Sequence, residues 1–214
     1  MQARHLLRRN RKHMTDSRQF ALATQRNRDP ILDVLRTALP ASGLVLEIAS
    51  GSGEHVVHFA EALPDLAFQP SDPTPAALAS IAAWTAETGV ANVRPPIRLD
   101  VTERPWPIAS ADAILCINMI HISPWAATVA LIEGAAKILP AGAPLYLYGP
   151  YLRREVATAE SNLAFDRSLR ERNPDWGVRD LAEVAGLAQR SGFSRPLLTE
   201  MPANNLSLVF RRSA

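Results

Sequence analysis

The fold is decided by one stretch, Val45-Leu-Glu-Ile-Ala-Ser-Gly-Ser-Gly-Glu-His55. It begins inside a short apolar run, residues 44–49, of the kind that forms a strand buried on both faces. Gly51 and Gly53 then allow a tight turn and let a ligand lie against bare backbone. Apolar residues return at helical spacing over residues 54–63, so a helix begins near Glu54 with its free N–H groups at the same spot. This order predicts a ligand site in an α/β protein.

The chain on both sides of this stretch alternates strand and helix from Met14 onward. Asp29 and Pro30 are interpreted as the N-cap and first position of a helix over 29–39. Pro95 and Pro96 limit the strand over 93–99 to a sheet edge. Further strands are expected at 66–70, 113–119 and 144–148, and further helices at 75–88, 126–139 and 181–192.

The alternation predicts a mostly parallel sheet with helices on both faces. Two apolar alternations, 196–201 and 206–211, flank the turn residues 202–205 and predict a closing antiparallel hairpin. Residues 150–180 are polar, basic and aromatic, and are interpreted as an insertion that forms a lid. The expected organisation is one domain over residues 14–214.

The charge is concentrated at the head of the chain. Residues 1–28 carry eight of the 23 Lys and Arg residues but one of the 21 acids, so the remainder has a net charge of −5. Residues 1–13 are expected to be a disordered basic extension before Met14, because a short charged tail has no core to join. An arm that binds nucleic acid is the weaker interpretation.

Composition excludes several classes of function. One cysteine rules out an internal disulfide, and no cluster of Cys and His suits a metal site. No apolar run reaches the roughly 18 residues of a membrane span, and the head lacks an apolar signal core. A cytoplasmic protein without a metal or a membrane partner is therefore expected.

Each of the first four predicted strands has a polar residue near its C-terminal end. Glu47 is an acid inside an apolar strand, and it suits a cationic ligand better than a pyrophosphate. Asp72 comes about twenty residues after the glycine turn, where a carboxylate can accept both hydroxyls of a ribose. Asp100 can accept an adenine amino group while Val101 packs on the ring, and Asn118 ends the fourth strand. Each acid alone could be a turn or cap residue, but their order favours one shared site.

That order resembles the class I S-adenosylmethionine (SAM)-dependent methyltransferases over residues 44–148. The resemblance implies a seven-stranded Rossmann-like sheet and SAM as the cofactor. It implies that Glu47, Gly51 and Gly53 hold the methionine part, Asp72 the ribose and Asp100 the adenine, with Asn118 beside the sulfonium.

The wider sequence is similar to one branch, the DUF938 or methyltransferase-like 26 family, over nearly everything after residue 14. The resemblance to this branch does not imply any particular methyl acceptor. The similar stretches are Gln25–Leu32, Glu47–Gly53, Gln69–Pro73, Cys116–Trp125, Tyr146–Tyr151 and Met201–Ser207.

Catalytic candidates are expected just past the fourth strand, where a nucleophile would be aligned and deprotonated. His121, three residues past Asn118, is the leading general base, and its alternative is a packed residue in an apolar turn. Tyr151, at the end of the fifth strand, is a second candidate. The remaining candidates are interpreted as cofactor contacts: Arg26 and Asn27 before the first helix, and His55 after the glycine turn.

The sequence therefore predicts a methyltransferase that acts on a small molecule. A non-catalytic SAM-binding or scaffold protein with the same fold is an alternative prediction. A nicotinamide-dependent Rossmann enzyme is a further alternative, although Val56 occupies the place of its third glycine. The sequence leaves the acceptor and the oligomeric state open.

Overall fold

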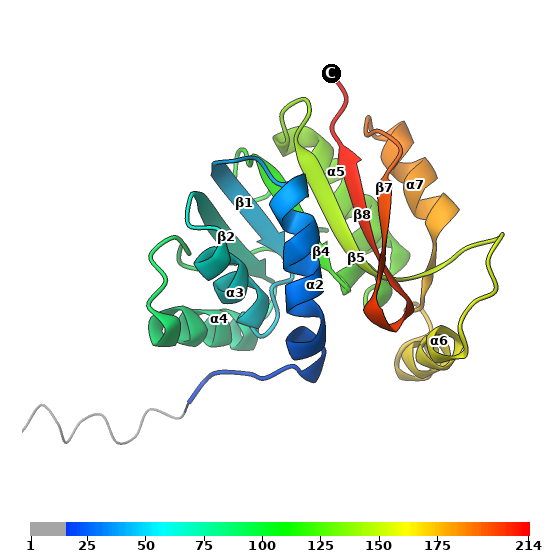
Figure 1. The fold of residues 1–214 in the computed structure, drawn as a ribbon, viewed down its shortest axis with the longest axis horizontal. Coiled ribbons are helices and arrows are strands. Elements are labelled where there is room, and N and C mark those ends of the chain that lie inside the picture. Colours follow the sequence, from blue (N-terminus) through cyan, green and yellow to red (C-terminus); the bar gives the residue numbers. More distant parts are fainter. Residues whose placement is uncertain (1–15) are drawn as a thin grey trace, which may run out of the picture.

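A computed structural model of the chain describes residues 16–214, and Figure 1 shows its ribbon. The segment for which a disordered extension was expected, 1–13, lies outside the described residues. The strands are β1 (Gly43–Ile48), β2 (Leu66–Asp72), β3 (Ile97–Arg98), β4 (Ala113–Ile117), β5 (Pro144–Leu152), β6 (Arg179–Asp180), β7 (Leu197–Met201) and β8 (Asn205–Arg211).

Seven of these strands form one sheet in the order β3-β2-β1-β4-β5-β8-β7, and β6 pairs only with the end of β5. β1, β2, β3, β4 and β5 are parallel, while β8 is antiparallel to both β5 and β7. The predicted sheet and closing hairpin are thus confirmed. The strand order reverses between β1 and β4, which is where an open α/β sheet forms a crevice at the carboxyl ends of its strands.

Helices cover both faces of the sheet. They are α2 (Leu22–Ala38), α3 (Glu54–Ala62), α4 (Pro75–Thr88), α5 (Trp125–Ile138), α6 (Glu160–Arg172) and α7 (Leu181–Arg190). Side chains of α2, α3 and α4 pack on one face, around Phe59, Phe68 and Tyr146. Side chains of α5 and α7 pack on the other face, around Leu131 and Leu147. The two cores pack against both faces of the central strands, so the carboxyl ends of β1 and β4 are held in fixed positions.

Most predicted elements lie within two or three residues of their expected bounds. The third strand is shorter than expected, since Val93 forms only an isolated bridge with Phe68 and the ladder is confined to residues 97–98. Asp72 is the last residue of β2, two positions beyond the expected end of that strand. Its carboxylate therefore lies at the strand end, as the sequence predicted.

The prediction that Asp29 caps the first helix is wrong. α2 begins at Leu22, and Pro30 lies inside it. The missed turns carry Thr24 and Asn27 on the buried stripe that continues to Ile31. Because those two residues are polar, the apolar pattern understated the length of the helix.

The segment over 150–180 contains α6, which the sequence pattern did not indicate. Only Asn162 and Leu169 of this helix are buried, so it has no apolar stripe of helical period. α6 contacts the short 3₁₀ turn Pro202–Asn204 between β7 and β8, at the lower edge in Figure 1. No helix in the described part of the chain is both long and apolar enough to cross a membrane.

Candidate active site

The glycine turn after β1 is open on one side and closed on the other. Gly51 has φ +56°, and a Cβ there would meet nothing nearer than 4.0 Å. Gly53 has φ +89°, and a Cβ there would lie 2.7 Å from the Cα of Ile81 on α4. Gly53 therefore lets α3 and α4 pack closely, whereas Gly51 leaves backbone exposed for a ligand.

Asp72 is tied to this turn. Its Oδ2 accepts a hydrogen bond from the Gly51 N–H at 3.1 Å, and its Oδ1 accepts from the N–H and hydroxyl of Thr74 at 3.0 and 2.8 Å. The side chain is almost fully buried at the end of β2. These contacts reach both carboxylate oxygens and fix the direction in which their remaining lone pairs point.

Asp100 is held in a similar way by Thr102. Its Oδ1 accepts from the Thr102 N–H at 2.9 Å and from the hydroxyl at 2.7 Å. These hydrogen bonds lower the pKa of the Asp100 carboxyl, so it is ionised at neutral pH. Thr74 and Thr102 were not predicted, although a Thr two residues after an acid is a recognisable turn signal.

A cavity of about 520 Å³ connects these two acids. Its walls come from the ends of β1 and β2, the segment after β3, the turn after β4 and the start of α5. The cavity walls are mostly apolar, and Asp72 and Asp100 are the only carboxylates among the described residues that line it. The lining residues are Ile48, Ala49, Asp72, Pro73, Thr74, Leu99, Asp100, Val101, Thr102, Met119, Ile122, Ser123, Pro124 and Ala127.

Glu47 lies beneath the turn with one oxygen unsatisfied. The side chain is 2% exposed, and its Oε2 has no hydrogen-bond partner. Burial raises the pKa of Glu47 to about 7, with a hydrogen bond from Ser50 opposing the rise and the Asp72 carboxylate adding to it. A buried carboxyl group with one oxygen unpaired is unusual in a stable core, and it suits a site that receives a cation.

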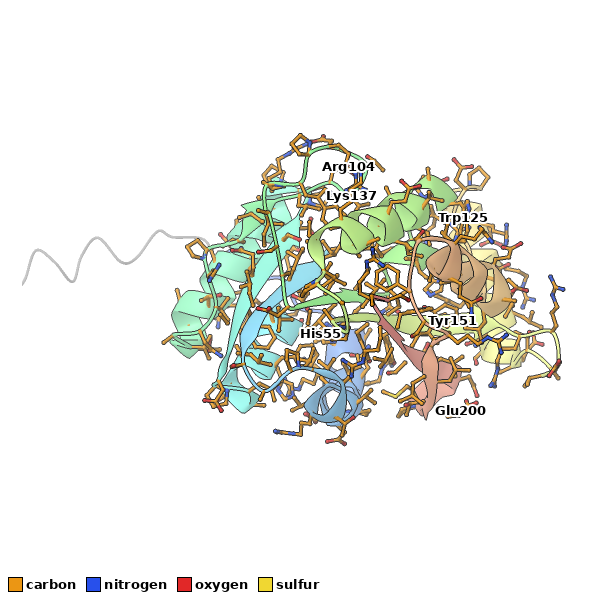
Figure 2. The ribbon with its side chains drawn as sticks, turned by 90° about the horizontal axis from the view of Figure 1, so that it is seen from above. His55, Arg104, Trp125, Lys137, Tyr151 and Glu200 are labelled. Atoms are coloured by element: carbon orange, nitrogen blue, oxygen red, sulfur yellow. The ribbon has the colours of Figure 1, made fainter. Side chains whose placement is uncertain are left out.

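Asn27 and His55 meet at the start of α3. Asn27 Oδ1 lies 2.8 Å from His55 Nε2, so α2 is joined to the helix that follows the glycine turn. Burial lowers the pKa of His55 to about 3, so the ring is neutral at physiological pH. Arg26, one residue earlier, is exposed. The structure thus brings Asn27 and His55 (Figure 2) together and leaves the Arg26 side chain in solvent.

His121 is enclosed by the segment over 150–180. Its Nδ1 accepts from the Arg179 N–H at 3.3 Å, and its Nε2 is buried without a partner. A Cβ at Gly149 would lie 2.3 Å from that Nε2, so the imidazole occupies the space that glycine leaves open. Burial lowers the pKa of His121 to about 3. With Nδ1 as acceptor, the neutral ring carries its proton on Nε2.

Tyr151 packs beside His121 with ring centroids 5.1 Å apart. Its hydroxyl is also buried and unpartnered, and burial raises its pKa well above the usual value. Tyr151 lines a second cavity, of about 110 Å³, together with Arg153 and Glu200, which form an ion pair at 2.7 Å (Figure 2). Asn118 has φ +62°, and its Oδ1 would lie 3.3 Å from a Cβ at Gly149, so it borders the same space as the His121 ring.

Arg179, a residue of the expected lid, holds the turn after β4, and this contact was not predicted. Its Nε donates to the Ile120 carbonyl at 2.9 Å, and its Nη2 donates to the Ser123 carbonyl at 2.6 Å. The same turn contributes Met119 and Ser123 to the wall of the larger cavity. Arg179 therefore links the segment over 150–180 to that cavity.

A larger hollow, about 760 Å³, lies beside the C-terminal half of α5 near Arg104 and Lys137 (Figure 2). Among the described residues, those that line this hollow include none of the predicted site residues and no carboxylate. If size alone decided which hollow binds a ligand, this one would be favoured. Ligands of open α/β sheets bind at the carboxyl ends of strands, which favours the cavity between Asp72 and Asp100.

The fold is similar to that of several solved methyltransferases. An O-methyltransferase described as putative from Nostoc punctiforme PCC 73102 is 17% identical, with a TM-score of 0.77 over 89% of this chain and 58% of its own. Human N-acetylserotonin methyltransferase, solved with SAM, is 14% identical, with a TM-score of 0.73 over 90% and 53%. An O-methyltransferase family 2 protein from Planctomyces limnophilus DSM 3776, solved with apigenin, is 18% identical, with a TM-score of 0.71 over 86% and 61%.

These likenesses establish a class I methyltransferase fold, and the chain spans between half and two thirds of the length of those proteins. The name methyltransferase-like 26 stays a prediction. A family model described as "Protein of unknown function (DUF938)" matches residues 18–212, so this chain belongs to the DUF938 family.

Proposed function

We propose that this protein is a SAM-dependent methyltransferase that acts on a small molecule. The observation that carries the proposal is the cavity between Asp72 and Asp100, which adjoins the open backbone of Gly51. The human relative in fold was solved with SAM and the Planctomyces limnophilus protein with apigenin, which supports both the cofactor and the class of acceptor.

The residues present fit the cofactor. The unpartnered Oε2 of Glu47 would face its ammonium, and the space above Gly51 would take its methionine chain. Asp72 would accept the ribose hydroxyls, and Asp100 with Val101 would hold the adenine. When bound, SAM supplies an activated methyl group on a sulfonium. The protein's own task is then to align an acceptor and exclude water.

On the acceptor side, we assign alignment to the residues around Gly149. Asn118 would lie beside the methyl group, and the segment over 150–180 would cover it as a lid. The general-base role of His121 stays a prediction. The geometry favours a packing role, because Nδ1 is occupied by the Arg179 N–H and Nε2 carries the proton. Tyr151 stays a second candidate for contact with the nucleophile.

Two measurements test the proposal. Isothermal titration should detect S-adenosylhomocysteine with a micromolar Kd and no comparable binding of nicotinamide dinucleotides. SAM carrying a labelled methyl group, incubated with a metabolite pool, should then transfer label to a small molecule. Tight binding without transfer would favour a non-catalytic SAM-binding protein. Binding of the dinucleotide instead would overturn the proposal.

A further inference from the structure

Ser52 lies between the two glycines of the turn. Two buried side chains from the neighbouring helices form hydrogen bonds with it. The Ser52 carbonyl accepts a hydrogen bond from the Ser80 hydroxyl of α4 at 2.6 Å. The Ser52 hydroxyl donates to Oε2 of Glu54 on α3 at 3.0 Å. Ser80 is 0% exposed and Glu54 is 4% exposed, so both of these supporting residues are buried.

The same two side chains also bind the segment before α2, residues 16–21. Gln19 N–H donates to the Ser80 hydroxyl oxygen at 2.8 Å, and Ala21 N–H donates to Glu54 Oε2 at 2.7 Å. Trp84 on α4 anchors this segment, since its Nε1–H donates to the Gln19 carbonyl at 2.9 Å and the Phe20 ring packs on it at 5.1 Å. In Figure 1 the segment passes below α4 and α3 before it enters α2.

The turn needs such support. Gly51 and Gly53 both have positive φ, and glycine populates many backbone conformations when nothing restrains it. A turn that samples several conformations binds more weakly, because only part of the population can receive the ligand. The contacts to Ser52 remove that freedom in the protein before any ligand arrives.

We propose that Glu54 and Ser80 are positioning residues for cofactor binding: they hold Ser52 so that the glycine turn is set to receive the methionine end. Residues 16–21 complete the arrangement by donating one N–H to each. This inference rests on the proposed function, and it concerns the methionine end only. Adenine and ribose would contact the adjoining cavity between Asp72 and Asp100.

The test compares two ligands on the folded protein well below its unfolding temperature. S-adenosylhomocysteine carries the amino-acid chain, whereas 5′-methylthioadenosine has the same nucleoside without it. Glu54→Ala and Ser80→Ala should each raise the Kd of the first ligand by about tenfold, the effect of losing one buried hydrogen bond. The Kd of the second should change less than about twofold.

Two matched variants separate positioning from general destabilisation. Glu54→Gln keeps an oxygen that can accept both hydrogen bonds, so it should restore the affinity that Glu54→Ala loses. Ser207→Ala removes another buried serine hydroxyl, which lies 2.6 Å from Tyr146 Oη between β5 and β8. It should leave both Kd values at the wild-type level even if it lowers the unfolding temperature.

The outcomes are distinct. Unchanged affinity for S-adenosylhomocysteine in both alanine variants would overturn the inference, as would equal losses for the two ligands. If the wild-type protein binds neither ligand, the proposed function itself fails. Wild-type binding with a loss confined to S-adenosylhomocysteine, reversed in Glu54→Gln, would establish the positioning role.

Discussion

Glu47→Gln should stabilise the ligand-free protein while weakening its binding of the cofactor. Burial raises the pKa of Glu47 from 4.5 to about 7. Because the folded state then binds the proton more tightly than the unfolded chain, folding stability falls as pH rises between these two values. The loss is absent below about pH 4.5 and complete above about pH 7.

The size of the effect follows from the two pKa values. The difference between about 7 and 4.5 corresponds to roughly 3 kcal/mol. Glutamine has nearly the same shape and no charge, so Glu47→Gln should recover up to that amount at pH 8 and little at pH 4.5. For a domain of this size the gain is roughly 6–12 °C in unfolding temperature.

Thermal unfolding of both proteins at pH 5 and pH 8 measures the gain, with titration of S-adenosylhomocysteine at pH 8 alongside. The variant should bind at least about tenfold more weakly, since its amide offers no charge to the ligand's ammonium. Glu133→Gln, at an exposed position of α5, is the control and should change neither quantity. A variant less stable than wild type at pH 8, or a stability difference independent of pH, would refute the reasoning.

Three further predictions concern the ribose contact, the head of the chain and His121. Asp72→Ala should weaken binding of S-adenosylhomocysteine by about 1–3 kcal/mol in a titration, and unchanged affinity would remove Asp72 from the ribose role. Deleting residues 1–13 should leave the unfolding temperature and the Kd unchanged, because a short charged segment has no apolar core to join; a loss of several degrees would show that the segment packs on the domain. His121→Ala should lower the unfolding temperature while turnover per folded molecule changes by less than about tenfold. A fall of about a hundredfold, measured together with the folded fraction, would instead assign His121 the general-base role.

The sequence predicted the sheet and the acids at its edge because both depend on short-range patterns. Buried strands and helices have their own periods, and the ends of parallel strands meet at one edge whatever the loops do. Asp72 and Asp100 therefore converge as expected. The first turns of α2 and the whole of α6 were missed, since their buried positions include Thr24, Asn27 and Asn162, which carry no apolar signal.

The contacts that support the site could not be predicted in the same way. Gln19 meets Ser80 across 61 positions, and Arg179 meets His121 across 58. No spacing rule connects residues so far apart in the chain, and a serine in an alanine-rich helix looks like any other small residue. The roles of Glu54, Ser80 and Arg179 follow from where the fold places them.

Three unpartnered buried polar atoms lie near the ends of adjacent strands. They are Oε2 of Glu47 on β1, Nε2 of His121 after β4 and the hydroxyl of Tyr151 on β5. Folded proteins seldom leave such atoms unpaired, because each costs about 1–3 kcal/mol. Apolar residues of similar size at these positions would leave no such atom unpaired and would form a more stable edge. Retaining polar groups there lowers the stability of the ligand-free protein, and the loss is recovered when a bound ligand supplies the missing partners. A substitution of matching size at Glu47 or Tyr151 that stabilises this edge should therefore be one that impairs binding, which separates these two positions from the rest of the core, where stability and function fall together.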